Sequence, residues 1–247
     1  MKSRQSFELT NKIILPMNHK EVLNRLHALA NPEKVLYKEK KFGITTQNAL
    51  GIYNQDLKII AKDTGRDSDL ALKLFASDIY EAKILCSKIF RVKDLNEKLM
   101  DQWVQSFDNW EICDSFCMAL FAKSPFAITK AIEWSTNEHE FTKRAAFTTM
   151  ASYCISDKKT KNQVFEDFLS IIERESLDER LYVKKAVNWA LRNIGKRNAD
   201  LRKSALKVAR CLVEKSKRST QWIGKNALSE LEKPALRMSD YPRSIYR

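Results

Sequence analysis

The chain has 247 residues, with 44 lysines and arginines against 31 aspartates and glutamates, for a net charge of +13. Apolar residues make up 44%, and there are only five Gly and five Pro, so the composition supplies a core and favours an all-helical protein. The segment from Met1 to Pro16 contains only a very short apolar run, so we expect neither a secretory signal nor a membrane span. We expect a cytoplasmic protein, in which five scattered cysteines without nearby histidines predict free thiols and no zinc site. We expect no metal and no cofactor.

Helical periodicity runs along almost the whole chain. Asn31-Pro32 breaks the first helical region, Leu50-Gly51 leads into another, and residues 64–67 form a break before the next helix. Asp108 and Glu111 predict a capping box at the start of a later helix. Further helices are expected at 79–92, 95–107, 109–122, 126–135, 140–154, 160–174, 180–195, 200–214 and 219–231. We see no strand alternation of any length and no glycine-rich phosphate loop.

The expected helices follow one another through short links, a pattern typical of an α-solenoid of helical hairpins rather than of a four-helix bundle. We therefore expect one repeat domain over residues 1–234 and a short basic tail over residues 235–247. The positive charge is unevenly distributed, because residues 179–225 hold 14 Lys or Arg and 3 Asp or Glu, a net of +11. Such a block is typical of phosphate contacts, although a well-solvated helical surface would give the same charge.

Four residues are spaced as if to meet on one surface. Asp114 follows Trp110 by four positions, which places both side chains on one face of a helix. The interval from Trp110 to Arg144 and the longer interval from Arg144 to Trp189 are both close to the period of paired-helix repeats. In a solenoid, one residue from each repeat can face a shared concave surface. Two indoles, a carboxylate and a guanidinium on a basic surface predict a site that handles a nucleotide.

Trp189 does not lie with the apolar residues of its own helix. At about 100° per residue it points away from their stripe, and its neighbours along the helix are Lys185, Arg192 and Lys196. An indole on such a face can stack on a base or sugar while the cations hold phosphates. Alternatively, Trp189 packs on the stem of Arg192 or on the neighbouring repeat.

Asp114 is expected opposite the core stripe of its helix, in line with Trp110, Cys117 and Phe121. In that position burial would raise its pKa and a nearby arginine would lower it. Arg144 is the candidate partner, and it could clamp a phosphate, orient Asp114 or do both. The plainer interpretations are an ordinary ion pair or exposed helix acid for Asp114 and a surface arginine for Arg144.

Three segments around these residues resemble the HEAT-like-repeat DNA alkylation repair glycosylases, the AlkD family. They are Asp-Asn-Trp110-Glu-Ile-Cys-Asp114-Ser, Thr-Lys-Arg144-Ala-Ala and Val-Lys-Lys-Ala-Val-Asn-Trp189-Ala-Leu-Arg. Asn31-Pro-Glu-Lys34 and Leu50-Gly-Ile52 are similar to N-terminal segments of that family. The resemblance covers nearly the whole chain, and it implies an all-α solenoid of HEAT-like hairpin repeats with a curved, basic concave surface.

The resemblance also implies a monofunctional glycosylase that acts in base excision repair. It would excise cationic N3- and N7-alkylated purines from duplex DNA, as a monomer, without flipping the base, in the cytoplasm and at the nucleoid when bound to DNA. Asp114 would stabilise the oxocarbenium-like sugar and orient water. The predicted catalytic residues are Asp114, Trp110 and Trp189. The predicted DNA-binding residues are Arg144, Lys185, Arg192 and Lys196.

The chain departs from the family pattern at two places. Asn109 stands where the family prototype has a second tryptophan before Trp110, and residues 38–48 align poorly, which leaves Tyr37 and Phe42 as candidates for an aromatic DNA contact. Two other functions compete: a non-catalytic module that binds distorted or branched DNA, and a HEAT-like protein scaffold without a nucleic acid partner. The basic block and the exposed position expected for Trp189 argue against the scaffold. Asp114 argues against pure DNA binding, because a carboxylate repels phosphate.

Overall fold

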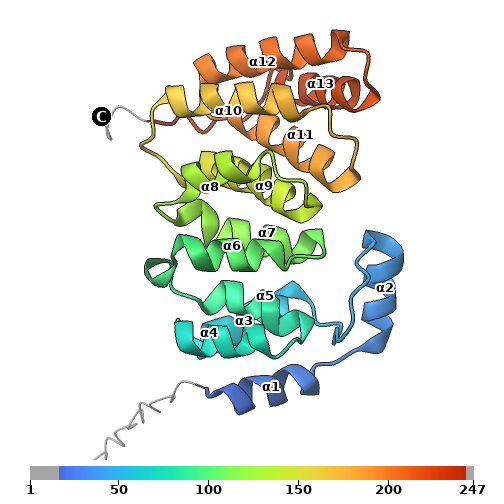
Figure 1. Ribbon diagram of the computed structural model, residues 1–247, viewed down its shortest axis with the longest axis vertical. Coiled ribbons are helices and arrows are strands. Elements are labelled where there is room, and N and C mark those ends of the chain that lie inside the picture. Colours follow the sequence, from blue (N-terminus) through green and yellow to red (C-terminus); the bar gives the residue numbers. More distant parts are fainter. Residues whose placement is uncertain (1–16, 243–247) are drawn as a thin grey trace, which may run out of the picture.

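Every regular element in the part of the chain described by the computed structural model, residues 17–242, is a helix (Figure 1). The α-helices are α1 His19–Ala28, α2 Pro32–Phe42, α3 Asn54–Thr64, α4 Ser68–Ala76, α5 Tyr80–Ile89, α6 Glu97–Gln105, α7 Trp110–Ala119, α8 Ala127–Trp134, α9 Glu140–Ser156, α10 Asn162–Glu175, α11 Leu181–Gly195, α12 Ala199–Glu214 and α13 Arg218–Leu231. Two 3-10 turns, η1 Val92–Asp94 and η2 Phe121–Lys123, lie between them. The predicted all-α class is confirmed.

Polar side chains set the start of many of these helices, as N-terminal capping requires. Capping side chains that accept a backbone N–H are contributed by Asn18, Asn31, Asp67, Asn96, Asn109, His139 and Asn198. At α7 the Oδ1 of buried Asn109 accepts from the backbone nitrogens of Glu111 and Ile112 at 3.0 and 3.1 Å. The predicted Asp108–Glu111 capping box is therefore wrong, because Asn109 occupies the capping position and the Glu111 side chain bonds elsewhere.

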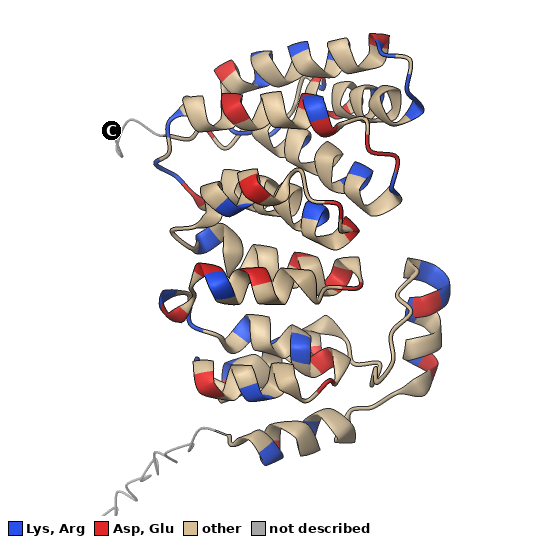
Figure 2. Ribbon diagram, in the orientation of Figure 1, with Lys and Arg blue, Asp and Glu red and all other residues tan. Residues whose placement is uncertain are grey.

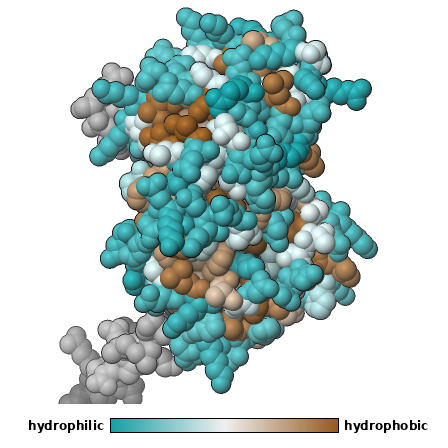
Figure 3. All heavy atoms as spheres, viewed as in Figure 1, coloured by the Kyte–Doolittle hydropathy of each residue, from teal (hydrophilic) through white to brown (hydrophobic). Residues whose placement is uncertain are grey.

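The helices stack in two rows, as expected for a solenoid of helical hairpins. An inner row consists of α5, α7, α9, α11 and α13, each packed on the next. An outer row of α4, α6, α8, α10 and α12 covers one side of it, and the stack runs from α1 at one end to α12 and α13 at the other (Figure 1). Hydrophilic side chains dominate the face seen in Figure 3, with separate apolar patches between them. No helix within residues 17–242 is long and apolar enough to cross a membrane.

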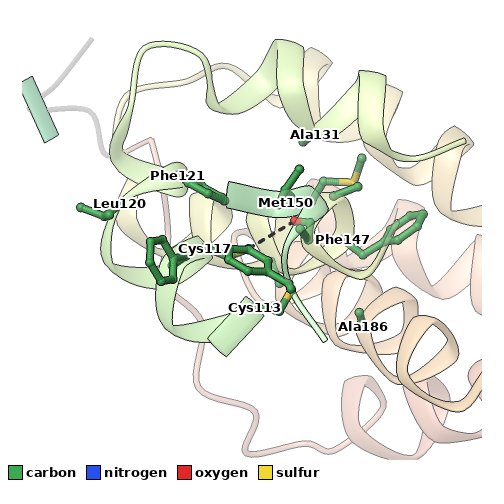
Figure 4. Close-up of a cluster of buried hydrophobic side chains, with 14 of the residues drawn as sticks. Cys113, Cys117, Leu120, Phe121, Ala131, Phe147, Met150 and Ala186 are labelled. Carbon is green, nitrogen blue, oxygen red and sulfur yellow. Dashed lines mark hydrogen bonds between the residues drawn. The ribbon is translucent and has the colours of Figure 1, made fainter. Parts of the chain in front are cut away.

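A continuous apolar core runs through both rows. Between α7 and α9 it contains Cys117, Phe121, Phe147 and Met150, all fully buried (Figure 4). The prediction that Cys117 and Phe121 lie opposite the core stripe of this helix is therefore wrong. Since α7 packs against α5 on one side and α9 on the other, its apolar surface is wider than a single stripe. All five cysteines are free, and four of them are buried.

Helix α2 stands beside the stack rather than in it (Figure 1). Its N-terminal end is fixed by a backbone hydrogen bond, in which the Asn31 N–H donates to the Leu50 carbonyl at 2.7 Å. The buried Glu81 carboxylate accepts from the nitrogens of Leu50, Gly51 and Ile52 at 2.8, 2.8 and 3.1 Å. Gly51 has a positive φ of 76°, and a Cβ there would lie 2.1 Å from the Asn31 oxygen. Only glycine fits this position, so the orientation of α2 depends on it.

The chain after α13 is irregular but not detached. The backbone nitrogens of Ser239 and Tyr241 donate to the carbonyls of Lys196 and Arg197 at 2.9 and 3.0 Å, which holds this segment against the end of α11. The last helix ends at Leu231, and the division of the chain at residue 234 stays a prediction. The expectations for positions 1–16 and 243–247 lie outside the described residues.

Two glycines with positive φ provide a matched test of the close contact at the N-terminal end of α2. We expect Gly65→Ala, where φ is 78° and a Cβ has open space, to lower the free energy of unfolding by about 1–3 kcal/mol through backbone strain alone. Gly51→Ala should cost about 1–3 kcal/mol more, because the methyl group collides with the Asn31 carbonyl. Urea unfolding of both variants measures the difference, and equal losses would contradict this account.

Candidate functional site

Trp110, the first residue of α7, joins that helix to the end of α2. Its indole Nε1 donates to the Phe42 carbonyl at 3.1 Å, and the two rings meet edge to face with centroids 6.3 Å apart. Trp110 is half-buried, so one part of the ring packs on the core while the rest faces the space between α2 and α7. Phe42, a candidate aromatic contact, is thus placed beside the predicted catalytic helix.

A buried polar cluster holds α2 in this position. The Lys38 Nζ lies 3.0 Å from Glu111 Oε2, and the Tyr80 hydroxyl donates to the same oxygen at 2.7 Å. The Tyr80 hydroxyl also lies 3.3 Å from the capping oxygen of Asn109. Burial, together with the Glu111 charge, raises the pKa of Tyr80 well above its ordinary value, so its hydroxyl remains a donor. The cluster therefore connects α2, α5 and α7 at the residue that follows Trp110.

Asp114, one turn after Trp110, forms a two-pronged ion pair with Arg144 of α9. Arg144 Nε lies 2.9 Å from Oδ1 of the carboxylate, and its Nη2 lies 2.7 Å from Oδ2. Thr148, one turn further along α9, lies 3.2 Å from Oδ1 through its hydroxyl. The remaining nitrogen of Arg144, Nη1, donates to the Tyr182 carbonyl of α11 at 2.7 Å. Three inner helices thus meet at this pair.

Burial and charge act in opposite directions on the carboxyl group. The side chains of Asp114 and Arg144 are only 18% and 8% exposed. Burial raises the pKa of Asp114 above its ordinary value, and it is opposed by the charge and hydrogen bonds of Arg144 and by the Thr148 hydroxyl. Burial lowers the pKa of Arg144, but the charge and hydrogen bonds of Asp114 more than offset it and raise that pKa overall. The sequence-based expectation of both opposing effects on Asp114 is confirmed in direction.

A pocket of about 490 Å³ opens next to the pair, between α2 and the inner row. Its lining residues are Lys41, Phe42, Gly43, Trp110, Asp114, Arg144, Leu181, Tyr182 and Lys185. The Tyr182 hydroxyl lies 3.5 Å from the Gly43 carbonyl, so the end of α2 spans from α7 to α11 across the pocket. Figure 2 marks Lys and Arg on both borders, at the end of α2 and on α11. The pocket therefore combines one carboxylate with cations and aromatic rings.

The predicted residues of α11 divide into two groups. Lys185 is exposed and lines the pocket, whereas Trp189, one turn further along, is half-buried against the core and does not line it. Arg192 and Lys196 both bond to Glu230 of α13, with Lys196 Nζ at 2.7 Å from a carboxylate oxygen. The structure brings together Trp110, Asp114, Arg144 and Lys185. The roles assigned to Trp189, Arg192 and Lys196 stay predictions.

Some residues at the site were not found by sequence reasoning. Thr148 lies at i+4 from Arg144, a spacing that could have indicated a second donor to the same acid. Tyr182 and Glu230 had no local signal, because their contacts join helices that are far apart in the chain. Within residues 17–242, no group of three or more His, Cys, Asp or Glu could hold a metal ion.

Comparisons with known proteins bear on the family and the fold of the chain. A family model described as "DNA alkylation repair enzyme" matches residues 22–231. A solved structure described as "A new family of proteins related to the HEAT-like repeat DNA glycosylases with affinity for branched DNA structures" has a TM-score of 0.74 and 18% identity, over 92% of this chain and 100% of that chain. Two designed armadillo repeat proteins, one in complex with the peptide (KR)4, have TM-scores of 0.41 and 0.37, identities of 13% and 15%, and cover 87% and 85% of this chain and 95% and 98% of their own. No curated protein matches the sequence significantly.

The family model spans most of the chain, including the site residues Trp110, Asp114, Arg144 and Lys185. The chain therefore belongs to the DNA alkylation repair enzyme family, and its fold is that of a HEAT-like repeat protein. The resemblance inferred from the segments around Trp110, Arg144 and Trp189 is confirmed at this level.

We expect the buried Asp114–Arg144 pair to contribute strongly to the free energy of unfolding. We expect Arg144→Met to lower the free energy of unfolding by about 3–5 kcal/mol, because it leaves the buried Asp114 carboxylate without its counter-charge. Arg210→Met is a matched control, since the Arg210–Glu232 pair is 63% and 51% exposed and should contribute less than about 1 kcal/mol. Urea unfolding at neutral pH measures both. Similar losses in the two variants would show that burial of the pair does not matter.

Proposed function

We propose that the protein is a monofunctional DNA glycosylase that excises cationic N3- and N7-alkylated purines from duplex DNA. The observation that carries the proposal is the Asp114 carboxylate, oriented by Arg144 and Thr148 at the wall of an open pocket with basic and aromatic sides. Membership of the DNA alkylation repair family supports the substrate class. A surface that only bound phosphates would gain nothing from a carboxylate in its centre.

The chemistry needs one well-placed negative charge. An alkylated purine already carries positive charge, so it leaves as a neutral base with the electrons of its bond to C1′, and it needs no acid. The deoxyribose left behind becomes oxocarbenium-like, and a carboxylate can stabilise that cation and orient the water that attacks C1′. The water transfers its proton to the carboxylate as the new C–O bond forms, and the carboxylate then returns it to solvent. Asp114 supplies the carboxylate in this scheme.

Arg144 and Trp110 have supporting roles in the proposal. Arg144 holds both carboxylate oxygens, so that Asp114 has one orientation and its ionised form is favoured against burial. Three N–H groups of the guanidinium donate to Asp114 and to the Tyr182 carbonyl. A phosphate beside the lesion could accept hydrogen bonds from the N–H groups that remain. The ring of Trp110, fixed by its bond to Phe42, would stand against the sugar and add cation–π stabilisation. Trp189 would contact the damaged nucleotide further along the inner row.

A non-catalytic function in binding branched DNA is the second candidate. It is favoured by one observation, the likeness in fold to a protein described as related to HEAT-like repeat DNA glycosylases and as having affinity for branched DNA structures. The same basic surface would serve both functions, so only chemistry at Asp114 separates them. In either case we propose a monomer acting on DNA in the cytoplasm.

Replacing the carboxylate tests the proposal directly. We expect Asp114→Asn to abolish release of N7-methylguanine from a methylated duplex, while DNA affinity is retained or increased because a negative charge has been removed. Asp69→Asn, at an exposed position on α4, is the matched control and should leave release unchanged. Released base is measured by chromatography and affinity by fluorescence polarisation. Binding of a duplex by wild type without any release would favour the branched-DNA function.

The pH dependence of excision should follow the ionisation of Asp114. Because the carboxylate must be charged, the rate is present above the folded-state pKa and is lost as pH falls through it. Burial raises that pKa, so the acidic limb should lie above the ordinary value of 3.8. Thr148→Val removes a hydrogen bond that favours the ionised form and should move the limb to higher pH. Single-turnover rates, corrected for uncatalysed loss of the base, measure the limb, and an unchanged limb in Thr148→Val would contradict this cause.

We further propose that the target base stays stacked in the duplex and that Asp114 approaches the deoxyribose rather than the base. The carboxylate lies on the wall of an open pocket rather than in a closed one. Wild type should therefore release bulky N7 adducts of guanine at rates within about tenfold of N7-methylguanine, since nothing encloses the base. Excision assays on duplexes with adducts of increasing size measure this. Complete rejection of every bulky adduct would favour a snug base pocket and a flipped base.

A further inference from the structure

Helix α13 carries an exposed basic and aromatic stripe on one face. Arg218, Trp222 and Lys225 follow one another at intervals of four and three residues, so they share a face of the helix, and all three are exposed. Trp222 is 39% exposed, which is unusual for an indole in a helix that buries Ile223, Ala227 and Leu231. In the part of the chain that the structure describes, neither Arg218 nor Lys225 forms an ion pair. We call these three residues the α13 stripe.

The α13 stripe connects to the candidate active site through two lysines of α11. The Lys184 Nζ lies 5.2 Å from the centre of the Trp222 ring, a cation–π contact between neighbouring helices of the inner row. The next residue, Lys185, lines the pocket that contains Asp114 and Arg144. Within residues 17–242, neither lysine pairs with a carboxylate. A continuous series of unneutralised cations therefore leads from the pocket to α13.

A second group of cations on α11 is neutralised instead. Arg192 and Lys196 both bond to Glu230, two turns beyond Trp222 on α13. The charges of Lys196 and Arg192 also lower the pKa of Glu230, although burial opposes the shift, so this acid stays ionised and paired. A phosphate at this position would have to displace a carboxylate, whereas Arg218 and Lys225 have no carboxylate partner within residues 17–242. The two groups of cations should therefore differ in their use.

We propose that the α13 stripe, with Lys184, binds the sugar–phosphate backbone of the duplex on one side of the lesion. This inference rests on the proposed function, and it extends the DNA-contacting surface beyond the pocket. Arg218 and Lys225 lie about 10 Å apart along the helix, with Trp222 between them, so the cations can take phosphates while the indole packs on a deoxyribose. Continuity with the Asp114 pocket favours DNA over an acidic protein as the occupant.

Equilibrium binding of an undamaged duplex of about 20–30 base pairs to the full chain tests the inference, by fluorescence polarisation at salt concentrations from about 50 to 200 mM. We expect Trp222→Ala to weaken binding by roughly three- to tenfold, and Trp222→Phe to recover most of the loss because a ring is retained. Lys184→Met should reduce the slope of log affinity against log salt by about 0.9, the loss of one phosphate contact. Lys215→Met is the matched control, since its cation already pairs with Glu173, and it should leave the slope unchanged.

The outcomes separate this inference from the proposed function. Wild-type affinity and slope in both Trp222→Ala and Lys184→Met, with wild type binding the duplex, would overturn the inference and leave excision by Asp114 untouched. An equal change of slope in Lys215→Met would also overturn it, because the paired and unpaired cations would then be equivalent. Failure of wild type to bind any duplex would overturn the proposed function itself. Thermal unfolding of each variant shows whether a loss of affinity comes from loss of fold.

Discussion

The bidentate pair between Asp114 and Arg144 is the contact around which the candidate site is organised. It joins three consecutive inner helices, because the acid belongs to α7, the guanidinium to α9, and the third nitrogen of Arg144 bonds to a carbonyl at the start of α11. Two charges with side chains only 18% and 8% exposed are costly to desolvate, and such a pair persists only where geometry and further hydrogen bonds satisfy both partners. The Thr148 hydroxyl and the Tyr182 carbonyl provide those bonds. A change in the stacking of any of the three helices would therefore disturb the acid.

The same pair explains how a buried carboxylate can serve in catalysis. Burial favours the neutral acid, which could not stabilise a cationic sugar, while Arg144 and Thr148 favour the charged form. The acid is held at a pocket wall, so it can meet a substrate without leaving its partner. In the proposed mechanism Arg144 is therefore a positioning residue, which holds both carboxylate oxygens of Asp114. Its proposed contact with phosphate would use N–H groups that this arrangement leaves over.

Helix α2 supplies one border of the pocket, through Lys41 and Phe42. Its N-terminal end is fixed by Gly51 and Glu81. Further along the helix Lys38 pairs with Glu111, and the last residue is held by the hydrogen bond from Trp110 to the Phe42 carbonyl. The end of α2 reaches the Tyr182 hydroxyl of α11, so one border of the pocket comes from a segment that is distant in the chain from both α7 and α11. The division of the cations on α11 has a similar origin, since Glu230 on α13 pairs with Arg192 and Lys196, whereas Lys184 and Lys185 have no carboxylate partner within residues 17–242.

Sequence patterns alone predict the helical class, the order and approximate ends of nearly all the helices and the family, and they identify Arg144 as the candidate partner of Asp114. Helical periodicity is local, and the repeat spacing indicates which residues of successive helices can share a surface. The tertiary structure alone decided that Cys117 and Phe121 belong to the core, that Asn109 caps α7, that Phe42 and Tyr182 border the pocket, and that Glu230 neutralises two predicted DNA-binding cations. Those facts depend on how helices rotate about their axes and which partners they meet across the stack. The repeat spacing can show that two helices are neighbours, but the charge on a surface depends on the side chain that stands opposite.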